Sequence, residues 1–418
     1  MTTGIMTICC MILLTIITEN IYLSFGRKVS LLSKHDSRPY IQHPVVLIPG
    51  IGGNQMYCKP KQFKGEPFPV WLNIFHMAFP SWINYLVHMK YDPIKKRSVD
   101  NDVCKMTIPG WGDTQPLENY NADGYSLGHY FHDLVKTLKE DAYFISNFTI
   151  RGAPYDFRRA PNENKAFMRN FKALIEETYT NGLNRSVVLV AHSLGSLYTK
   201  YFLDLQTYKW KEKYIRTYIS VAAPFGGSVN ALSSLLSGTN YNIFIHNPIL
   251  NRPLLRTLTS VSFLLPEPWL WPSNFPLVIT SRKNYTVNQF YDLFKDIGFP
   301  MGYQMMKSSK ENSNMFDDPQ GLSQILCVHS SDLLTVKQIV YKSYGHLHDN
   351  FPDHSPIPTF ENGDGTVNLA SLSVCRNWTN SKHILIPGVL HDEIVSDKRF
   401  INLVINTVGA KVNDTSNQ

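Results

Sequence analysis

A buried strand that stops abruptly and passes straight into a helix constrains this chain most. Residues 187–190 are Val-Val-Leu-Val, and the run gives way to Ala-His-Ser-Leu-Gly at 191–195. The next residues carry apolar side chains at helical spacing. A turn this tight accepts only small residues two positions before and after its apex, and Ala191 and Gly195 meet that need. The pattern predicts a nucleophile elbow with Ser193 at its apex; the alternative is a serine that caps an ordinary helix.

A glycine-rich loop follows an earlier apolar strand. Residues 45–48 are Val-Val-Leu-Ile, and Pro-Gly-Ile-Gly-Gly-Asn-Gln follows at 49–55. Glycines let backbone N–H groups turn toward a bound oxyanion. We therefore assign one oxyanion donor to the backbone N–H of Ile51 and the other to that of Leu194, at the start of the helix behind Ser193. The competing interpretation, a phosphate-binding loop, fails because no Gly-Lys-Ser/Thr sequence follows.

Two later loops supply an acid and a base. Asp364 lies in a glycine-flanked turn at 362–368, and His391 follows the short apolar run 384–386. Taken singly, His391 fits a surface histidine and Asp364 a turn residue or a cation ligand. Behind an elbow, His391 is expected to take the proton of Ser193, while Asp364 holds the imidazole in the required tautomer. The other acids considered lack flanking glycines: Asp332, Asp349 and Asp353.

The order of elements predicts an α/β fold. Strands are expected at 147–150, 187–190, 214–221 and 321–328, and helices at 126–139 and 166–179. Strands that alternate with helices indicate a doubly wound parallel sheet. The order serine, acid, histidine is that of α/β-hydrolases. We therefore predict one α/β-hydrolase domain over residues 40–410, which suits a chain of 418 residues with 43% hydrophobic content.

Two stretches interrupt this pattern. Residues 56–110 contain an aromatic, proline-broken segment, and we assign them to a membrane-binding subdomain, with ordinary subdomain core as the alternative. The candidates for contact with lipid or for lining an acyl channel are Trp71, Leu72, Phe75, Phe79 and Trp82. Residues 228–320 are loosely patterned and rich in proline, which predicts a lid or cap over the active site.

Charge and ligand patterns exclude some classes of function. The net charge of +7 comes without the Lys/Arg blocks of nucleic-acid binders, so it suits an anionic membrane surface better than a duplex. No Cys or His spacing is typical of a metal site, and we expect neither metal nor cofactor. Asp156, Arg158 and Arg159 are predicted to form a charge network beside the core.

Several features predict export. The apolar run 5–17 is short for a membrane span, so we interpret residues 1–26 as a signal peptide, with an uncleaved anchor as the alternative. Residues 411–418 are expected to form a flexible tail. Five sequons fit a secreted chain: Asn147, Asn184, Asn284, Asn377 and Asn413. Four cysteines outside the leader permit three pairings: Cys58, Cys104, Cys327 and Cys375.

Together these segments resemble the lecithin:cholesterol acyltransferase family. The matching stretches are spread over nearly all of residues 43–410: 45–55, 151–164, 190–203, 223–227, 296–299, 363–368 and the turn at His391. Arg-Gly-Ala-Pro-Tyr-Asp-Phe-Arg-Arg-Ala-Pro-Asn-Glu-Asn at 151–164 is highly specific. Like 363–368, it favours the lysosomal phospholipase branch over the plasma cholesterol-acylating branch.

The resemblance implies an α/β-hydrolase core with a membrane-binding subdomain and a lid. It implies an acyl-enzyme on Ser193, formed from a glycerophospholipid and released to water or to a lipid alcohol such as ceramide. It also implies a disulfide between Cys327 and Cys375 and a lysosomal or extracellular location. A neutral-lipid or sterol-ester lipase or acyltransferase is the alternative enzyme. A catalytically silent lipid-binding protein is the alternative of another class.

Two positions depart from the family pattern. The residue after Pro49-Gly50 is an acid in the lysosomal branch and a cysteine in the plasma branch, but Ile51 here. A carboxyl beside an oxyanion helps only when protonated, so an apolar residue should weaken any demand for acidic pH. The second cysteine of the family's early disulfide is replaced near Ser81, and we hypothesise that Cys58 pairs with Cys104 instead.

Overall fold

The computed structural model of the protein describes residues 41–62, 64–72, 85–120, 128–239, 247–341 and 351–412. The chain divides into a unit of residues 1–41, of which only Ile41 is described, and a unit of residues 42–418 that holds every element below. Several predictions fall outside the described residues: the signal peptide at 1–26, Phe75, Phe79, Trp82, Asn413 and most of the tail. Within the described ranges, no helix is long and apolar enough to cross a membrane.

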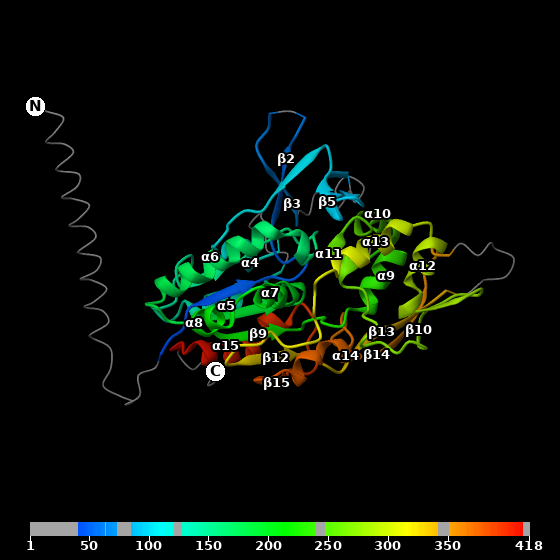
Figure 1. The fold of residues 1–418 in the computed structure, drawn as a ribbon. Coiled ribbons are helices and arrows are strands. Elements are labelled where there is room, and N and C mark those ends of the chain that lie inside the picture. Colours follow the sequence, from blue (N-terminus) through cyan, green and yellow to red (C-terminus); the bar gives the residue numbers. More distant parts are fainter. Residues whose placement is uncertain are drawn as a thin grey trace, which may run out of the picture. The chain divides into compact units, whose positions relative to one another are not determined.

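A six-stranded parallel sheet lies at the centre of the larger unit (Figure 1). Its order is β15–β12–β9–β8–β1–β7. The strands are β1 (Val45–Ile48), β7 (Ile150–Gly152), β8 (Val187–His192), β9 (Ile215–Val221), β12 (Ile325–His329) and β15 (Ser381–Leu385). The strand expected at 147–150 begins only at Ile150, because Asn147 adopts a φ of 60° and turns the chain. Likewise, the strand expected from 321 begins at Ile325, beyond a turn at Gly321 with φ 88°.

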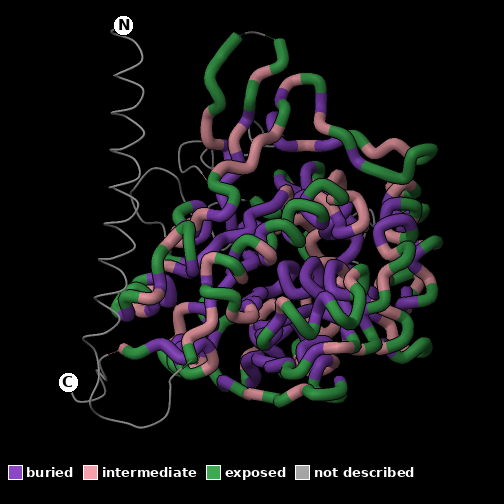
Figure 2. Tube along the Cα trace, turned by 60° about the vertical axis from the view of Figure 1, so that its left-hand side comes forward, coloured by how far each residue is buried: buried purple, intermediate pink, exposed green. Residues whose placement is uncertain are grey.

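Both faces of the sheet are buried, as is usual for parallel sheets. Alternate residues of β1 and β8 enter two separate cores, with Val46 and Leu189 in one and Val45 and Val188 in the other. Helices α6 (Lys165–Asn181), α7 (Leu194–Asp204) and α8 (Tyr208–Tyr214) pack into the first core, and α5 (His132–Leu138) and α15 (Lys398–Val408) into the second. Figure 2 shows this buried interior and the exposed loop between β2 and β3.

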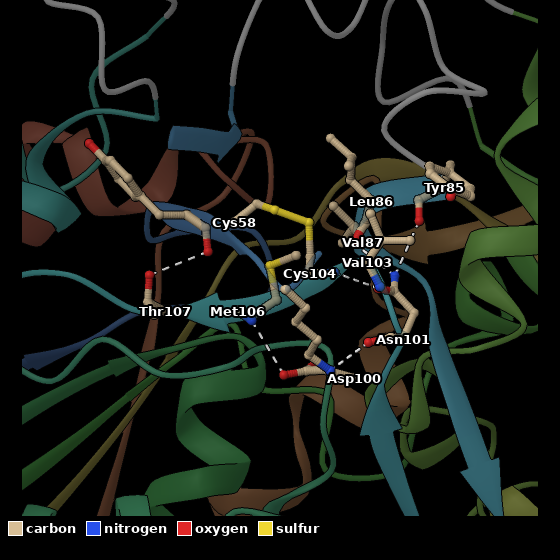
Figure 3. Close-up of a disulfide and its surroundings, with 12 residues drawn as sticks. Cys58, Tyr85, Leu86, Val87, Asp100, Asn101, Val103, Cys104, Met106 and Thr107 are labelled. Atoms are coloured by element: carbon tan, nitrogen blue, oxygen red, sulfur yellow. Dashed lines mark hydrogen bonds between the residues drawn. A yellow bond between two sulfur atoms is a disulfide. The ribbon is translucent and has the colours of Figure 1, made fainter. Parts of the chain in front are cut away.

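The range 56–110 forms two small antiparallel sheets. One has the order β3–β2–β6, from β3 (Phe68–Trp71), β2 (Met56–Pro60) and β6 (Cys104–Thr107); the other pairs β4 (Met89–Asp92) with β5 (Arg97–Asp100). Cys58 and Cys104 are joined in a disulfide between β2 and β6, with Cα atoms 5.3 Å apart (Figure 3). Figure 1 shows β2, β3 and β5 together on one side of the parallel sheet.

A buried ion-pair network joins the β4–β5 sheet to the core, and it contains the predicted charge network of Asp156, Arg158 and Arg159. The guanidinium of Arg158 donates to Asp156 at 2.8 Å, to Asp100 of β5 at 2.6 Å and to the carbonyl of Val87 at 3.0 Å. Arg159 donates to Asp156 at 2.9 Å. Because Arg158 is 1% exposed and pairs with two carboxylates, removal of both would leave a buried charge unpaired.

The range 228–320 is more regular than its sequence suggests. It contains α9 (Val229–Ser237), α10 (Arg252–Leu255), α11 (Thr259–Phe263), α12 (Phe290–Asp296), α13 (Pro300–Ser309), β10 (Pro276–Ile279) and β11 (Asn284–Thr286). The prolines at 266, 268 and 272 lie in the segment that connects α11 to β10, so they interrupt no helix or strand. The fold continues past 320, because β10 pairs with β13 (Leu333–Val340), which pairs with β14 (Ile357–Gly363).

The remaining elements are short. They are α4 (Gln115–Glu118), α14 (Leu369–Leu372), η1 (Pro161–Glu163), η2 (Pro248–Leu250), η3 (Val287–Gln289), η4 (Val374–Asn377) and η5 (Ile394–Ser396). A second disulfide joins Cys327 of β12 to Cys375 of η4, with Cα atoms 5.6 Å apart. The asparagines of four sequons are exposed: Asn147, Asn184, Asn284 and Asn377.

Candidate active site

Ser193 lies in a strained turn between β8 and α7. Its backbone has φ 52° and ψ −126°, a conformation that non-glycine residues rarely adopt. The turn leaves no space at Gly195, where a Cβ atom would lie 2.3 Å from the carbonyl oxygen of Pro49. Only glycine therefore lets α7 start this close to the loop that follows β1. The serine is 5% exposed and lies at the carboxyl end of a central strand.

The structure brings Ser193, His391 and Asp364 into one hydrogen-bonded chain. His391 Nε2 lies 2.8 Å from Ser193 Oγ, and His391 Nδ1 lies 2.6 Å from Asp364 Oδ2. Because Nδ1 donates to the carboxylate, Nε2 of the neutral imidazole is free to accept the serine proton. Asp364 follows β14, a strand of the four-stranded sheet, whereas Ser193 and His391 follow strands of the parallel sheet.

Asp364 is fully buried, and hydrogen bonds hold its carboxylate in place. Its Oδ1 accepts the backbone N–H groups of Thr366 at 3.0 Å and Val367 at 2.7 Å. Burial alone would raise the pKa of Asp364, but the charge and hydrogen bond of His391 and the two backbone donors outweigh it and lower the pKa. The carboxylate therefore stays ionised and orients the imidazole.

The negative charge of Asp364 makes His391 a stronger base than an ordinary histidine. Burial alone would lower its pKa, but the charge and hydrogen bond of Asp364 raise it above the ordinary value, and the charge of Asp392 adds to this. Because the pKa of His391 is raised, its neutral form, which can accept the proton of Ser193, becomes predominant at a higher pH than in an ordinary histidine.

The two assigned oxyanion donors come from the start of α7 and from the loop after β1. Leu194 is the first residue of α7, so its N–H has no acceptor within the helix. The N–H of Ile51 follows Gly50, whose own N–H is occupied by the hydroxyl of Tyr130 at 2.9 Å. Among the described residues, Ile51 donates to no protein acceptor. A Cβ at Gly50 would lie 2.9 Å from the Cβ of Ser193, which shows how closely this loop approaches the serine.

A second hydrogen-bonded chain links these loops, and sequence analysis missed it. His192 Nε2 lies 2.8 Å from the carbonyl oxygen of His391, so Nε2 carries the hydrogen. His192 Nδ1 therefore accepts the hydroxyl of Tyr130 at 2.6 Å, and that hydroxyl in turn accepts the Gly50 N–H. Burial, together with the nearby His391, lowers the pKa of His192 to about 3, so it stays neutral.

An apolar cavity of about 290 Å³ opens at Ser193 and His391. Trp71 and Ile51 line it near the oxyanion loop, whereas Leu72, the other described lipid-contact candidate, does not. Deeper apolar walls come from the range expected to form the cap: Leu254, Leu255, Leu258, Val261 and Leu264. A cavity of this kind suits a hydrocarbon chain next to the serine.

The rival acids lie elsewhere. Asp332 bonds to Ser331 and Asn362, and Asp353 pairs with Arg252 at 2.7 Å. Asp349 lies outside the described residues. Over the described ranges, no group of three or more His, Cys, Asp or Glu residues is arranged to hold a metal ion.

A parallel sheet that carries a serine and a histidine at its carboxyl ends, with an aspartate hydrogen-bonded to the histidine, defines the class of α/β-hydrolase enzymes. The model of the lecithin:cholesterol acyltransferase family matches residues 68–358. The chain therefore belongs to the lecithin:cholesterol acyltransferase family.

Two relatives support this assignment, and one solved structure shares the fold. The lysosomal phospholipase A and acyltransferase of Homo sapiens is 35% identical over 372 residues, which cover 85% of this chain and 87% of the relative. The phosphatidylcholine-sterol acyltransferase of Mus musculus is 31% identical, over 80% of this chain and 77% of the relative. A chain in the crystal structure of the Tle4–Tli4 complex shares the fold, with a TM-score of 0.50, 13% identity, and coverage of 88% of this chain and 99% of that one.

Proposed function

We propose that this protein is a serine phospholipase A and acyltransferase. Ser193 is the nucleophile, His391 the base, and Asp364 the residue that orients the base. The observation that carries the proposal is the Ser193–His391–Asp364 chain at the opening of an apolar cavity. The human relative, named a lysosomal phospholipase A and acyltransferase, supports the same reaction class.

The reaction follows from the geometry in two similar steps. Ser193 Oγ attacks the carbonyl carbon of a glycerophospholipid ester while its proton passes to His391 Nε2. The N–H groups of Ile51 and Leu194 stabilise the oxyanion. The bond to the glycerol oxygen then breaks, and that oxygen takes the proton from His391. Water or a lipid alcohol next attacks the acyl-enzyme by the same route, which yields a fatty acid or an acylated alcohol and restores Ser193.

The surroundings of the site fit work on a lipid surface. We assign membrane contact to the range 56–110, whose Trp71 lines the cavity, and the lid to the range 228–320. A lysosomal or extracellular location suits two disulfides, four exposed sequon asparagines and the name of the human relative. The net charge of +7 favours anionic membranes.

The test combines a covalent probe with turnover. A fluorophosphonate should label wild-type protein, and the labelled peptide should contain Ser193. Ser193→Ala should lose labelling and release of fatty acid from phospholipid vesicles while it still binds the vesicles. The matched control is Ser228→Ala, a serine of the same cavity whose hydroxyl donates to the carbonyl of Thr366. Turnover that survives in Ser193→Ala, or a probe that labels another residue, would refute the mechanism.

A further inference from the structure

A second pocket, of about 490 Å³, lies outside the catalytic cavity. Trp269 and Leu270, from the connection between α11 and β10, form one wall, and residues 316–318, which follow α13, form another. Residues between 370 and 379, around α14 and η4, form the third. No described residue lines both this pocket and the catalytic cavity, so the two are separate sites.

The pocket exposes two aromatic rings to solvent. Trp269 is 39% exposed and Phe316 is 58% exposed. Their rings meet edge to face, with centroids 5.3 Å apart. Burial of aromatic rings is favourable, so a ring pair left exposed in a pocket indicates a surface that another group covers.

One of the predicted glycosylation sites lies in the wall of this pocket. Asn377, the acceptor of the sequon Asn377-Trp378-Thr379, lines the pocket and is exposed. Among the described residues its side-chain amide forms no hydrogen bond, so Nδ2 is open to a sugar, and any glycan on it starts at the pocket. The asparagines of the other described sequons do not line the pocket: Asn147, Asn184 and Asn284.

The middle residue of the same sequon fixes the geometry of the pocket. Trp378 is buried, and its indole N–H donates to the carbonyl of Phe316 at 2.7 Å. Cys375, two residues before Asn377, is joined to β12 by the disulfide with Cys327. The protein itself therefore holds Asn377 and the main chain of Phe316 relative to each other, which limits the entropy lost when a sugar docks between them.

The pocket offers the groups that a pyranose sugar requires. The C–H bonds on one face of N-acetylglucosamine carry a slight positive charge and pack on the negative face of an aromatic ring. Its hydroxyl and acetamide groups need polar partners. The side chains of Asp318 and Arg376 line the pocket, and within the described part of the chain neither forms a hydrogen bond or an ion pair.

We propose that a glycan on Asn377 docks in this pocket, with its first N-acetylglucosamine against Trp269 and Phe316. The docked sugar contacts all three walls, so it stabilises the connection between α11 and β10 against the segments that follow α13 and surround η4. This inference does not depend on the phospholipase function, because the pocket is separate from the catalytic cavity.

The first measurement is the occupancy of Asn377. The full chain is secreted from a eukaryotic host and treated with peptide N-glycosidase F in heavy-oxygen water, which converts each glycosylated asparagine to a mass-labelled aspartate. Peptide mapping should find this label at Asn377 in most molecules. An unmodified Asn377 would overturn the proposal.

Hydrogen exchange then measures docking. Peptides that cover residues 266–272 and 314–318 are compared in wild type and in two variants that lose the sequon in different ways, Asn377→Gln and Thr379→Ala. Exchange should be about two- to tenfold faster in both variants, the range for one aromatic contact. Wild type whose glycans are trimmed to a single N-acetylglucosamine should keep its protection, because the first sugar makes the contact.

Two matched controls should exchange as wild type does. Thr379→Ser changes the same residue but keeps the sequon, and Asn284→Gln removes an exposed sequon outside the pocket. Circular dichroism in the far ultraviolet checks that each variant is folded. No acceleration in the two sequon variants, an equal acceleration in Asn284→Gln, or loss of protection on trimming would refute the docked sugar.

The ring of Trp269 separates docking from a general effect of a bulky glycan. In Trp269→Leu, the further change Asn377→Gln should accelerate exchange at residues 314–318 much less than it does in wild type, because the ring that the sugar contacts is already gone. Equal acceleration with and without the ring would contradict the proposed contact. If Trp269→Leu fails to fold, the sequon variants and their controls still decide the outcome.

Discussion

Asp364 accepts three hydrogen bonds in a fully buried position, two from backbone N–H groups and one from His391. The two backbone donors hold the carboxylate in place independently of the histidine. We expect the carboxylate to keep the hydrogen of the neutral imidazole on Nδ1 of His391. Nε2 then carries no hydrogen and can accept the proton of Ser193. A neutral amide at this position can also donate a hydrogen bond, so it does not keep the hydrogen on Nδ1.

We expect Asp364→Asn to lower kcat by about 10³- to 10⁴-fold, because the amide stabilises the wrong tautomer of His391. The protein should remain folded, since the shape of the side chain is retained. Turnover of phospholipid vesicles measures the effect. Asp332→Asn is the control, because Asp332 is exposed and its carboxylate bonds to Ser331 and Asn362. An equal loss of kcat in this variant would contradict the assignment of Asp364 as the catalytic acid residue.

We expect Ile51 to affect how the activity depends on pH. In wild type, kcat/KM should fall as pH decreases through the raised pKa of His391, since the protonated imidazole accepts no proton. Ile51→Asp places a carboxyl beside the oxyanion, where only its protonated form helps, so activity should decline toward neutral pH relative to wild type. Profiles of both proteins on anionic vesicles test this. A sharply acidic wild-type optimum that Ile51→Asp leaves unchanged would contradict the prediction.

The residues that carry the proposed chemistry were predictable because each lies in a short local pattern. The elbow requires small residues around Ser193, and the turn at Asp364 requires its flanking glycines. Tyr130 and His192 carry no such signal. Their hydrogen bond joins residues 62 positions apart. From the sequence alone, a tyrosine in an amphipathic stretch is interpreted as an ordinary core residue. Only the folded chain shows that its hydroxyl meets the oxyanion loop.

At the scale of elements, the Tyr130–His192 chain joins three loops. It connects the glycine loop after β1, the elbow after β8 and the loop of His391 after β15. The proposed oxyanion donor at Ile51 and the proposed base at His391 are thus held relative to each other through one buried phenol. Such a connection positions catalytic groups and touches no substrate.

We expect Tyr130→Phe to lower kcat about ten- to a hundredfold with little change in KM, because the Gly50 N–H and His192 Nδ1 lose their partner and the oxyanion loop shifts. The rate of fluorophosphonate labelling should fall in parallel. Tyr143→Phe is the matched control, since the Tyr143 hydroxyl donates to the carbonyl of Gly182 at 3.3 Å, and Gly182 precedes the amino end of β8, whereas Ser193 follows its carboxyl end. Equal losses of kcat in both variants would indicate a general loss of stability.

The elements of the parallel sheet were predictable, whereas the insertions were not. Strands buried on both faces appear as continuous apolar runs, as in β1 and β8. By contrast, β14 is a partly exposed strand, and its partner β13 pairs in turn with β10, more than 50 residues earlier in the chain. No local pattern in 333–363 indicates that it completes a sheet begun in the range 228–320.

At the scale of the whole molecule, the net charge of +7 should guide the protein to anionic surfaces. We expect Ser193→Ala to bind anionic vesicles more tightly than zwitterionic ones, and the difference to shrink severalfold as salt rises, because the Debye length falls to about 3 Å at 1 M. Cosedimentation with vesicles measures this without turnover. Binding that ignores both lipid charge and salt would show that apolar contacts alone hold the protein at the surface.

The proposed nucleophile and its base are separated by 198 positions along the chain. A ribosome that has just added Ser193 to the chain has therefore not yet synthesised the segment that contains His391. No fragment released early in synthesis holds a complete site, so a truncated product could not attack the membranes of the compartment that makes it. The lipid-cleaving potential of this enzyme therefore arises only once the segment that contains His391 has also been synthesised.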